Sequence, residues 1–310
     1  MRRLPVLPGV LLVAVAAALW GTDPILRKPI QALPATTIVF GEHVLLVALT
    51  LPLLAGALRA VWSAGPRALA AAVVVGAGAS GAATILFTAA IRRDFITAVV
   101  MQEAQPLIAV LAAGAILGER PHRRFGWFLA AGLAGLWLVN QPQPLDPGAR
   151  GLAAVAEALA AATLWALGTV LGRYLGRSLR FDRIVALRFF FGLAATAVAV
   201  AVLGDRWHAG ARDSLWILAL ALVTGLLGLT LYYYGLRRTP AVMASLAELA
   251  NPAVLALAGI YAYHEHLRGS QWAGFALIAA VVTLLPVQRR RAIVELGPRD
   301  ARLEAAPASA

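Results

Sequence analysis

Three ionisable side chains lie inside long apolar segments of this 310-residue chain. Glu103 and Glu248 fall near the middle of such segments, and Arg188 falls near the start of another. A charge deep in a membrane helix costs about 3 kcal/mol on insertion scales, so such residues are functional candidates. A buried glutamate can carry a proton, anchor an ammonium group, or pair internally to lock helices together. Arg188 cannot lose its proton, so it must meet a carboxylate, carbonyl oxygens, water or an anionic substrate, or snorkel to the interface.

Polar and aromatic residues in the same segments could complete a binding site. His43 could titrate near neutral pH or be a hydrogen-bonded packing residue. Glu42 precedes it, and adjacent helical residues point about 100° apart, so we expect that the two do not both face one cavity squarely. Trp20 and Trp165 could stack on a ligand or fill space between helices. The predicted substrate-binding or coupling residues are Glu103, Glu248, Arg188, His43, Glu42, Trp20, Trp165, Gln102, Asn251 and Tyr232.

Two prolines and two glutamates form a second predicted set with a gate-like or structural role. Pro106 and Pro252 lie shortly after Glu103 and Glu248 and predict kinks that free a backbone carbonyl there. Glu119 and Glu265 each follow one of these prolines by 13 residues. A carboxylate opposes the dipole at a helix C-terminus, so we expect these two to cap a helix or to pair with an arginine.

The composition indicates the elements that must position these residues. Hydrophobic residues make up 61% of the chain and charged residues 14%, and the mean hydropathy is +0.78. Such a chain is a polytopic membrane protein rather than a soluble domain. The absence of cysteine excludes disulfides, zinc ribbons and thiol catalysis. The predicted membrane helices span roughly 8–26, 35–57, 68–91, 95–117, 125–141, 151–174, 183–203, 214–236, 241–263 and 271–287.

The basic residues predict how the chain crosses the membrane. The net charge of +12 does not indicate nucleic-acid binding, because the basic residues sit in short groups between apolar runs. If the N-terminus is cytoplasmic, 18 of them lie on the cytoplasmic side and 8 on the other, including Arg27 and Lys28. This split predicts a cytoplasmic (inner) membrane protein with both termini inside. The first apolar run, preceded by Arg2 and Arg3, resembles a signal peptide, but a later segment repeats it, so we interpret it as a helix.

The two halves of the chain repeat each other. A shift of 145 residues maps Trp20 onto Trp165, Phe87 onto Tyr232 and Glu103 onto Glu248, and a shift of 146 maps Pro106 onto Pro252. We predict repeats over 1–143 and 144–288, followed by a disordered cytoplasmic tail over 289–310. Five helices per repeat is an odd number, so the second repeat enters the membrane from the opposite side. The predicted fold is all-α: ten transmembrane helices in two inverted five-helix repeats.

This pattern resembles the drug/metabolite transporter superfamily, specifically its EamA-type members. The resemblance covers roughly residues 8–287. Its motifs are Leu19–Trp20–Gly21, Pro106 with Gly118–Glu119–Arg120, Leu164–Trp165–Ala166–Leu167–Gly168, Leu187–Arg188–Phe189, and Pro252 with Glu265. The family often carries an arginine in the second helix of each half; Arg188 fits, whereas the first half has His43 there. The resemblance implies export of small metabolites such as amino acids.

We therefore predict a secondary transporter with alternating access, and not an enzyme. No P-loop, dinucleotide fingerprint, His-Glu-x-x-His helix or Gly-x-Ser-x-Gly elbow occurs, so no cofactor, metal or catalytic residue is expected. The expected partners are a small-molecule substrate and the lipid bilayer, with proton coupling and facilitated diffusion both open. One chain holds both halves, so a monomer could suffice. The alternatives are uptake or exchange of an anionic metabolite or nucleotide conjugate, a membrane enzyme, and a non-transporting receptor.

Overall fold

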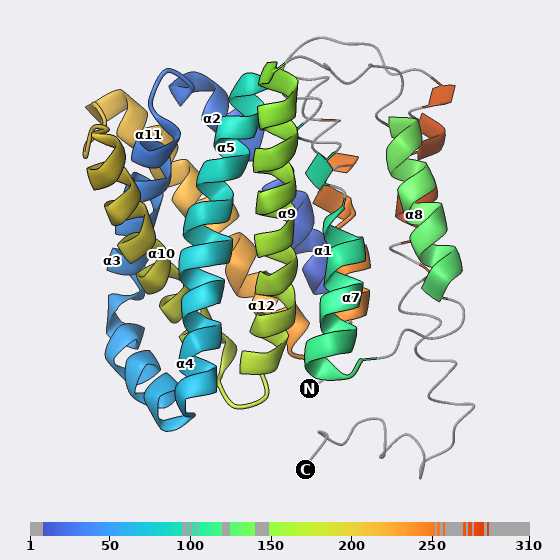
Figure 1. Cartoon of the computed structure of the whole chain (residues 1–310), viewed down its shortest axis with the longest axis horizontal. Helices are drawn as coiled ribbons and strands as arrows, with labels where there is room; N and C mark the ends of the chain where they lie inside the picture. The colour runs from blue at the N-terminus through green and yellow to red at the C-terminus, as the bar shows by residue number, and fades with distance from the viewer. Residues whose placement is uncertain are drawn as a thin grey trace, which may run out of the picture.

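The computed structural model describes residues 9–94, 104–119, 125–139 and 149–251, together with 98, 101, 102 and shorter stretches between 253 and 284. Throughout this part of the chain the regular secondary structure is helical (Figure 1). The elements discussed below are α1 (Gly9–Trp20), α2 (Asp23–Arg27), η1 (Lys28–Ile30), α3 (Ala35–Ser63), α4 (Pro66–Val73), η2 (Val74–Ala82), α5 (Ala83–Arg93), α7 (Gln105–Leu117), α8 (Phe125–Val139), α9 (Ala149–Leu175), α10 (Phe181–Leu203), α11 (Ala211–Leu220), η3 (Ala221–Gly228), α12 (Leu229–Leu236) and α13 (Ala241–Ala247).

In the described part of the chain, six helical stretches are long and apolar enough to cross a membrane. They are Gly9–Ile30, Ala35–Ser63, Pro66–Arg93, Leu152–Leu175, Phe181–Leu203 and Ala211–Leu236. Six of the ten predicted spans thus have a counterpart of sufficient length. The others fall on shorter apolar helices, such as α7, or partly outside the described residues, so the full count of ten stays a prediction. Residues 289–310, the predicted tail, lie outside the described residues.

Large apolar side chains stand on the outside of the bundle. Leu111 on α7 and Val202 on α10 are more than 70% exposed, and Leu51 and Val198 are about 60% exposed. By contrast, the buried residues include threonines, glutamates and an arginine. A soluble protein rarely leaves so much apolar surface in contact with water, whereas a bilayer solvates it well. The apolar exterior and partly polar interior are those of a polytopic membrane protein.

Two spans change helical type halfway along, in glycine-rich segments. Pro66–Arg93 passes through the π-helical segment η2, and Ala211–Leu236 passes through the π-helical segment η3. The two segments overlap when the sequence is shifted by 145 residues, so they are features of the repeat. Their glycines admit close neighbours: a Cβ on Gly76 would stand 2.9 Å from the backbone oxygen of Arg188. π-Helical turns displace carbonyls from the regular helical pattern and often occur at functional sites.

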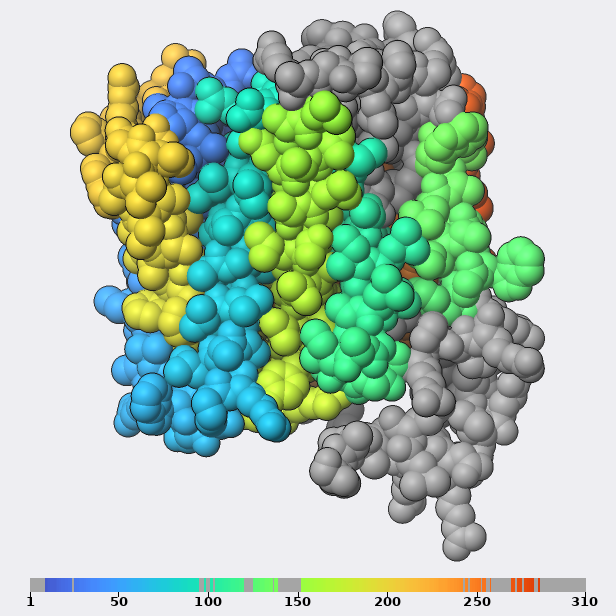
Figure 2. Space-filling model, viewed as in Figure 1, coloured from blue at the N-terminus to red at the C-terminus, as the bar shows by residue number. Residues whose placement is uncertain are grey.

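The corresponding spans run in opposite directions. In Figure 1 the chain rises from α4 to α5 but descends from α11 to α12. The first helix of each half packs into the other half: α1 lies against η3 and α12, whereas α9 lies against η2, α5 and α7. Figure 2 shows α5, α9 and α7 side by side on one face, with α8 at its edge. The two halves are therefore interleaved, and their shared interior is the site of the cavity described below.

One prediction concerns the close contact between α1 and α12. A Cβ on Gly235 would stand 2.7 Å from the backbone oxygen of Gly9 and 3.0 Å from the Cβ of Leu12, whereas one on Gly56 would meet nothing within 4 Å. Gly235→Ala is therefore expected to destabilise the bundle by about 1–3 kcal/mol through overpacking. The matched Gly56→Ala is expected to stabilise α3 by up to about 1 kcal/mol through helix propensity. Thermal unfolding of the two purified variants in detergent measures both signs, and equal effects would contradict the close contact.

Candidate transport cavity

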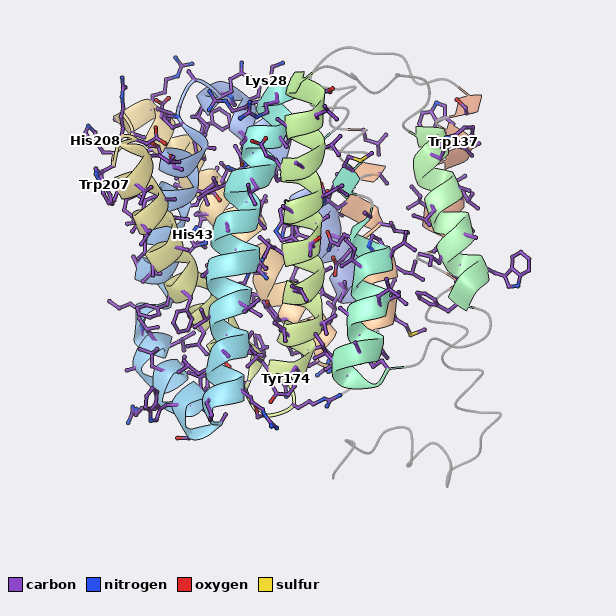
Figure 3. The ribbon with its side chains drawn as sticks, in the orientation of Figure 1. Lys28, His43, Trp137, Tyr174, Trp207 and His208 are labelled. Atoms are coloured by element: carbon purple, nitrogen blue, oxygen red, sulfur yellow. The ribbon has the colours of Figure 1, made fainter. Side chains whose placement is uncertain are left out.

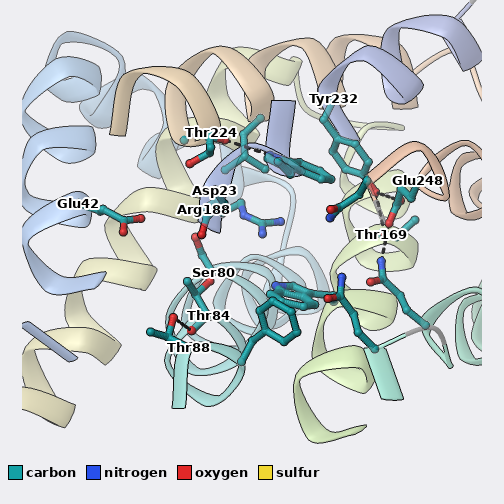
Figure 4. A pocket seen from close by; sticks show the side chains of 18 of the residues that line it. Asp23, Glu42, Ser80, Thr84, Thr88, Thr169, Arg188, Thr224, Tyr232 and Glu248 are labelled. Carbon is teal, nitrogen blue, oxygen red and sulfur yellow. Dashed lines mark hydrogen bonds between the residues drawn. The ribbon is translucent and has the colours of Figure 1, made fainter. Parts of the chain in front are cut away.

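A cavity of about 170 Å³ lies inside the bundle, between the two halves of the chain. For comparison, an apolar cavity of roughly 150 Å³ admits benzene, so this one suits a small solute. Figure 4 shows its wall from close by. It is lined by nearly all of the predicted site residues that the structure describes: Glu248, Arg188, His43, Glu42, Trp20, Trp165, Gln102, Asn251, Tyr232 and Pro106. The geometry brings these residues together, and their roles stay predictions.

The cavity is displaced along the helices toward the end of the bundle at which α2 lies. Of Pro66–Arg93, the lining residues are Ser80 and four residues in the last ten positions. Of α3, they are Glu42, His43 and Leu46, all in its first twelve residues. The upper part of α5 and the start of α3 both adjoin α2, which lies at the upper end in Figure 1. The cavity therefore extends from mid-membrane toward this end.

On one side of the cavity Glu248 accepts hydrogen bonds from three helices. Tyr232 on α12 donates to Glu248 Oε1 at 2.8 Å, Thr169 on α9 donates to the same oxygen at 3.1 Å, and Gln105 on α7 donates to Oε2. Tyr232 and Thr169 also lie 2.7 Å apart, oxygen to oxygen. Figure 4 shows Tyr232, Thr169 and Glu248 converging. Glu248 is 8% exposed and, among the described residues, is paired with no cation within salt-bridge distance.

Arg188 lies in the same cavity and forms no salt bridge with any described residue. Its Nη1 donates to the hydroxyl of Tyr233 at 2.9 Å and its Nη2 donates to the carbonyl of Ala79 at 3.1 Å. Its Nε is buried without a hydrogen-bond partner, and no described carboxylate forms a salt bridge with it. The side chain is 8% exposed and lies seven residues after the start of α10. Of the partners open from the sequence, the structure shows a backbone carbonyl, and the role of Arg188 stays a prediction.

A buried ion-pair network lines the end of the cavity near α2. Arg27 bonds to Asp23 one turn earlier on α2, and its Nη1 lies 2.8 Å from Oε1 of Glu42 on α3. The side chains of Arg27 and Glu42 are 11% and 7% exposed. The sequence predicts a continuous span over 8–26 with Arg27 on the side opposite the N-terminus, and it does not predict the break after Trp20. The chain forms the short helix α2 after a turn at Gly21 and Thr22, which returns Arg27 to the bundle interior.

His43 lies one residue beyond Glu42, and both residues line the cavity. Its Nδ1 lies 2.7 Å from the carbonyl of Val39, and its Nε2 lies 2.9 Å from the hydroxyl of Ser80 on η2. Figure 3 labels His43 within the bundle. The two side chains take different directions, Glu42 toward Arg27 of α2 and His43 toward Ser80 of η2. Both ring nitrogens have protein partners, which favours the packing interpretation of His43.

Two aromatic pairs stand across the cavity, and each takes one ring from each half of the chain. Trp20 of α1 packs on Tyr232 of α12 with ring centroids 5.0 Å apart, and Trp165 of α9 packs edge-on against Phe87 of α5 at 5.1 Å. The 145-residue shift converts one pair into the other. Such rings could hold an apolar or aromatic portion of a solute between them.

The carbonyl oxygens of η2 and η3 mark where the two halves differ. Trp20 Nε1 donates to the carbonyl of Thr224 in η3 at 3.0 Å. The repeat-related carbonyl is that of Ala79 in η2, and it accepts from Arg188 instead of from Trp165. The halves thus share their architecture but not their polar contacts.

The remaining predicted residues lie elsewhere. Glu119 stands just after α7, with its Oε1 3.8 Å from Nε of Arg173, in agreement with the expected pairing to an arginine. Pro106 lies in the first turn of α7, which begins at Gln105, so the expected kink within a continuous helix over 95–117 is wrong. Proline has no N–H to donate there, and its fixed φ favours the start of a helix. Glu103, Pro252 and Glu265 lie outside the described residues.

Sequence reasoning missed several polar residues of the cavity wall. Asp23 and Arg27 line the cavity but are not among the predicted site residues. Thr169 and Ser80 also line it, and nothing in the sequence distinguishes them from other helical threonines and serines. One signal was available, because Asp23 and Arg27 are spaced i, i+4, which pairs opposite charges on one helical face. Thr169 also lies four residues after Trp165 and shares its face of α9.

The model of the EamA-like transporter family matches the chain twice, over residues 7–141 and 152–286. A solved crystal structure of a protein aligns with a TM-score of 0.74 and 19% sequence identity, covering 91% of this chain and 98% of that chain. At this identity the alignment shows a shared fold. No curated protein matches the sequence. Because the two family matches together cover most of its length, the chain belongs to the EamA-like transporter family, a family of membrane transporters rather than enzymes.

Proposed function

We propose that the protein is a secondary transporter that exports small amphoteric metabolites, such as amino acids, by alternating access. The observation that carries the proposal is the presence of Arg188 and Glu248 in one small cavity, neither of them in a salt bridge with a described residue. A substrate carboxylate would bind Arg188 through its free Nε, and a substrate ammonium would bind Glu248. The side chain would lie between the aromatic pairs.

The repeat supports the proposed mechanism. Two halves whose corresponding helices run in opposite directions can exchange conformations, so that a site between them opens first to one side and then to the other. With both termini in the cytoplasm of an inner-membrane protein, as the basic residues predict, this structure's cavity extends toward the outer side. The protein would then be close to the state from which an exporter releases its substrate. A single chain contains both halves, so we propose that the monomer transports.

The alternative substrate class is an anionic metabolite or nucleotide conjugate. It would require several unpaired cations in the cavity. Arg27 is a second cation there, but Asp23 and Glu42 already neutralise it. The cavity volume of about 170 Å³ is also small for a nucleotide conjugate. Both observations favour the amphoteric class.

A counterflow experiment on the full chain in proteoliposomes tests the proposal. Liposomes loaded with unlabelled L-phenylalanine are expected to accumulate labelled L-phenylalanine, and external L-threonine should compete. Phenethylamine lacks the carboxylate and phenyllactate lacks the ammonium, so each should compete at least about tenfold less well, because each loses one charge-assisted contact.

Three results would contradict the proposal. Competition by phenyllactate equal to that of phenylalanine would remove the ammonium contact with Glu248. Counterflow with a sugar phosphate or a nucleotide conjugate, but not with amino acids, would support the anionic alternative. Binding of phenylalanine without any flux would indicate a receptor.

A further inference from the structure

At the end of the bundle away from α2, the helices α1, α9 and α12 are in direct contact. A Cβ on Gly172 of α9 would stand 2.6 Å from a ring carbon of Tyr233 on α12, and one on Gly235 of α12 would stand 2.7 Å from the backbone oxygen of Gly9 on α1. Leu236, the last residue of α12, is 1% exposed. The three helices therefore leave no space for a solute between them at this point.

The equivalent positions of the first repeat face the cavity instead. The 145-residue shift relates Tyr233 to Thr88 and Leu236 to Ile91. Thr88 and Ile91 on α5 line the cavity, whereas Tyr233 and Leu236 do not. One end of the bundle is thus packed where the repeat-related end is hollow. Such a difference between two halves of one design is what alternating access requires.

Arg173 joins the two helices at the packed end. It lies in the last turn of α9, and its Nη1 donates to the carbonyl of Leu236 at 3.2 Å and to the carbonyl of Arg237 at 2.6 Å. These carbonyls stand at the C-terminal end of α12, where a helix runs out of its own N–H donors and where a cation is favourable. The Arg173 side chain is 25% exposed, so water can replace these bonds when the helices separate.

The end of α7 meets the same arginine. Gly118 adopts a φ of +68° and ends α7, and Glu119 then places its Oε1 3.8 Å from the Nε of Arg173. The three helices that meet at Arg173 are also the three whose side chains donate to Glu248 in the cavity. A separation of these helices at their ends would therefore be felt at the predicted binding site.

We propose that Arg173 is a positioning residue of the transport cycle, which holds α12 to α9 while the cavity is open toward α2 and releases α12 when the opposite end opens. This rests on the alternating access of the proposed function. In the first state the guanidinium caps the end of α12, and in the second state water takes over both the guanidinium and the carbonyls. Arg173 thereby favours one state without preventing the other.

Single-cysteine reporters test this role, because the chain contains no cysteine of its own. Leu236→Cys marks the packed end, and the repeat-related Ile91→Cys marks the hollow end. The full chain is placed in nanodiscs, where both ends meet water, and is labelled with a water-soluble maleimide. With Arg173 present, Ile91→Cys should react much faster than Leu236→Cys. Arg173→Gln should raise the labelling rate of Leu236→Cys about tenfold, the effect of losing one charge-assisted hydrogen bond, and should not raise that of Ile91→Cys.

Three further variants identify the contact that matters. Arg177→Gln is the matched control, since Arg177 is exposed at the same end of the bundle and forms no salt bridge with a described residue. It should leave both labelling rates unchanged. Arg173→Lys keeps a donor for one carbonyl, so it should raise the rate of Leu236→Cys by less than Arg173→Gln does. Glu119→Gln should also have the smaller effect, because its oxygen lies 3.8 Å from Arg173.

The outcomes separate this role from a general effect on folding. Faster labelling of both reporters in Arg173→Gln would indicate a loosened fold and overturn the proposal, as would an unchanged rate of Leu236→Cys. An equal rise in Arg177→Gln would assign the effect to net charge and overturn it as well. If Arg173→Gln does not fold, Arg173→Lys decides by the same comparison. The labelling needs no substrate, so absence of amino-acid flux in proteoliposomes would overturn the proposed substrate class and leave the labelling result standing.

Discussion

Replacement of Arg188 by glutamine is expected to abolish transport of carboxylate-bearing substrates at ordinary concentrations. Loss of one partner of a buried charge pair costs about 2–5 kcal/mol, which corresponds to roughly thirtyfold to several thousandfold in affinity. Folding should survive, because the variant removes a buried cation that has no salt bridge with a described residue. The measurement is the concentration dependence of L-phenylalanine counterflow, compared with that of phenethylamine, which has no carboxylate.

Two further variants separate charge from geometry at this position. Arg188→Lys keeps the charge but loses the planar fork that reaches both Tyr233 and the carbonyl of Ala79, so it should recover only part of the affinity. Tyr233→Phe removes a single hydrogen bond and should cost about tenfold or less. Equal loss of phenylalanine and phenethylamine transport in Arg188→Gln would refute a carboxylate contact and indicate a structural role.

Replacement of Arg27 by glutamine is expected to destabilise the protein strongly. The substitution leaves Glu42 and Asp23 without their cation, and loss of one partner from a buried pair costs about 3–5 kcal/mol. The double variant Arg27→Gln with Glu42→Gln should recover most of this loss, because the carboxylate that had lost its partner is then neutral as well. Thermal unfolding of the variants in detergent measures the effect.

The matched control is Arg93→Gln at the C-terminal end of α5. Arg93 pairs with Glu157 at 3.0 Å, but its side chain is 46% exposed, so the pair should contribute about 1 kcal/mol or less. A loss of stability in Arg27→Gln no larger than that in Arg93→Gln would show that the network near α2 does not hold the fold together. If Arg27→Gln loses more stability than Arg93→Gln, but the double variant with Glu42→Gln recovers none of that stability, the loss comes from the unpaired Asp23.

The sequence predicted the membrane class, the repeat and much of the cavity wall because these depend on strong local signals. A glutamate or arginine inside an apolar segment is costly, so Glu248 and Arg188 stood out from composition alone. Trp20 and Trp165 indicate a repeat because chance rarely places two tryptophans at the same position of two related segments. The hydrogen-bond partners of the site residues are harder to predict. Threonine and serine are common in helices, so Thr169 and Ser80 are recognised as site residues only once the structure shows which helix lies opposite them.

The errors concern helix ends. The apolar run predicts one continuous span over 8–26, whereas α1 ends at Trp20 and the chain turns at Gly21 and continues as α2, which buries Arg27 in the bundle. Pro106 was placed within a continuous helix because the apolar run spans it, although α7 begins one residue earlier. Hydropathy shows where apolar residues lie along the chain, but it does not show where a helix ends. The backbone polar groups that a helix break leaves unpaired can be satisfied by neighbouring helices, and this does not change the hydropathy of the sequence.

The crossed aromatic pairs tie the movements of the two repeats to each other. Trp20 with Tyr232, and Trp165 with Phe87, each join opposite halves, so a rotation of one half that loosens the first contact also disturbs the second. The two repeats are therefore expected to move together rather than one at a time. Fluorescence of a variant that keeps only Trp20 and one that keeps only Trp165 should then change at the same rate when substrate binds.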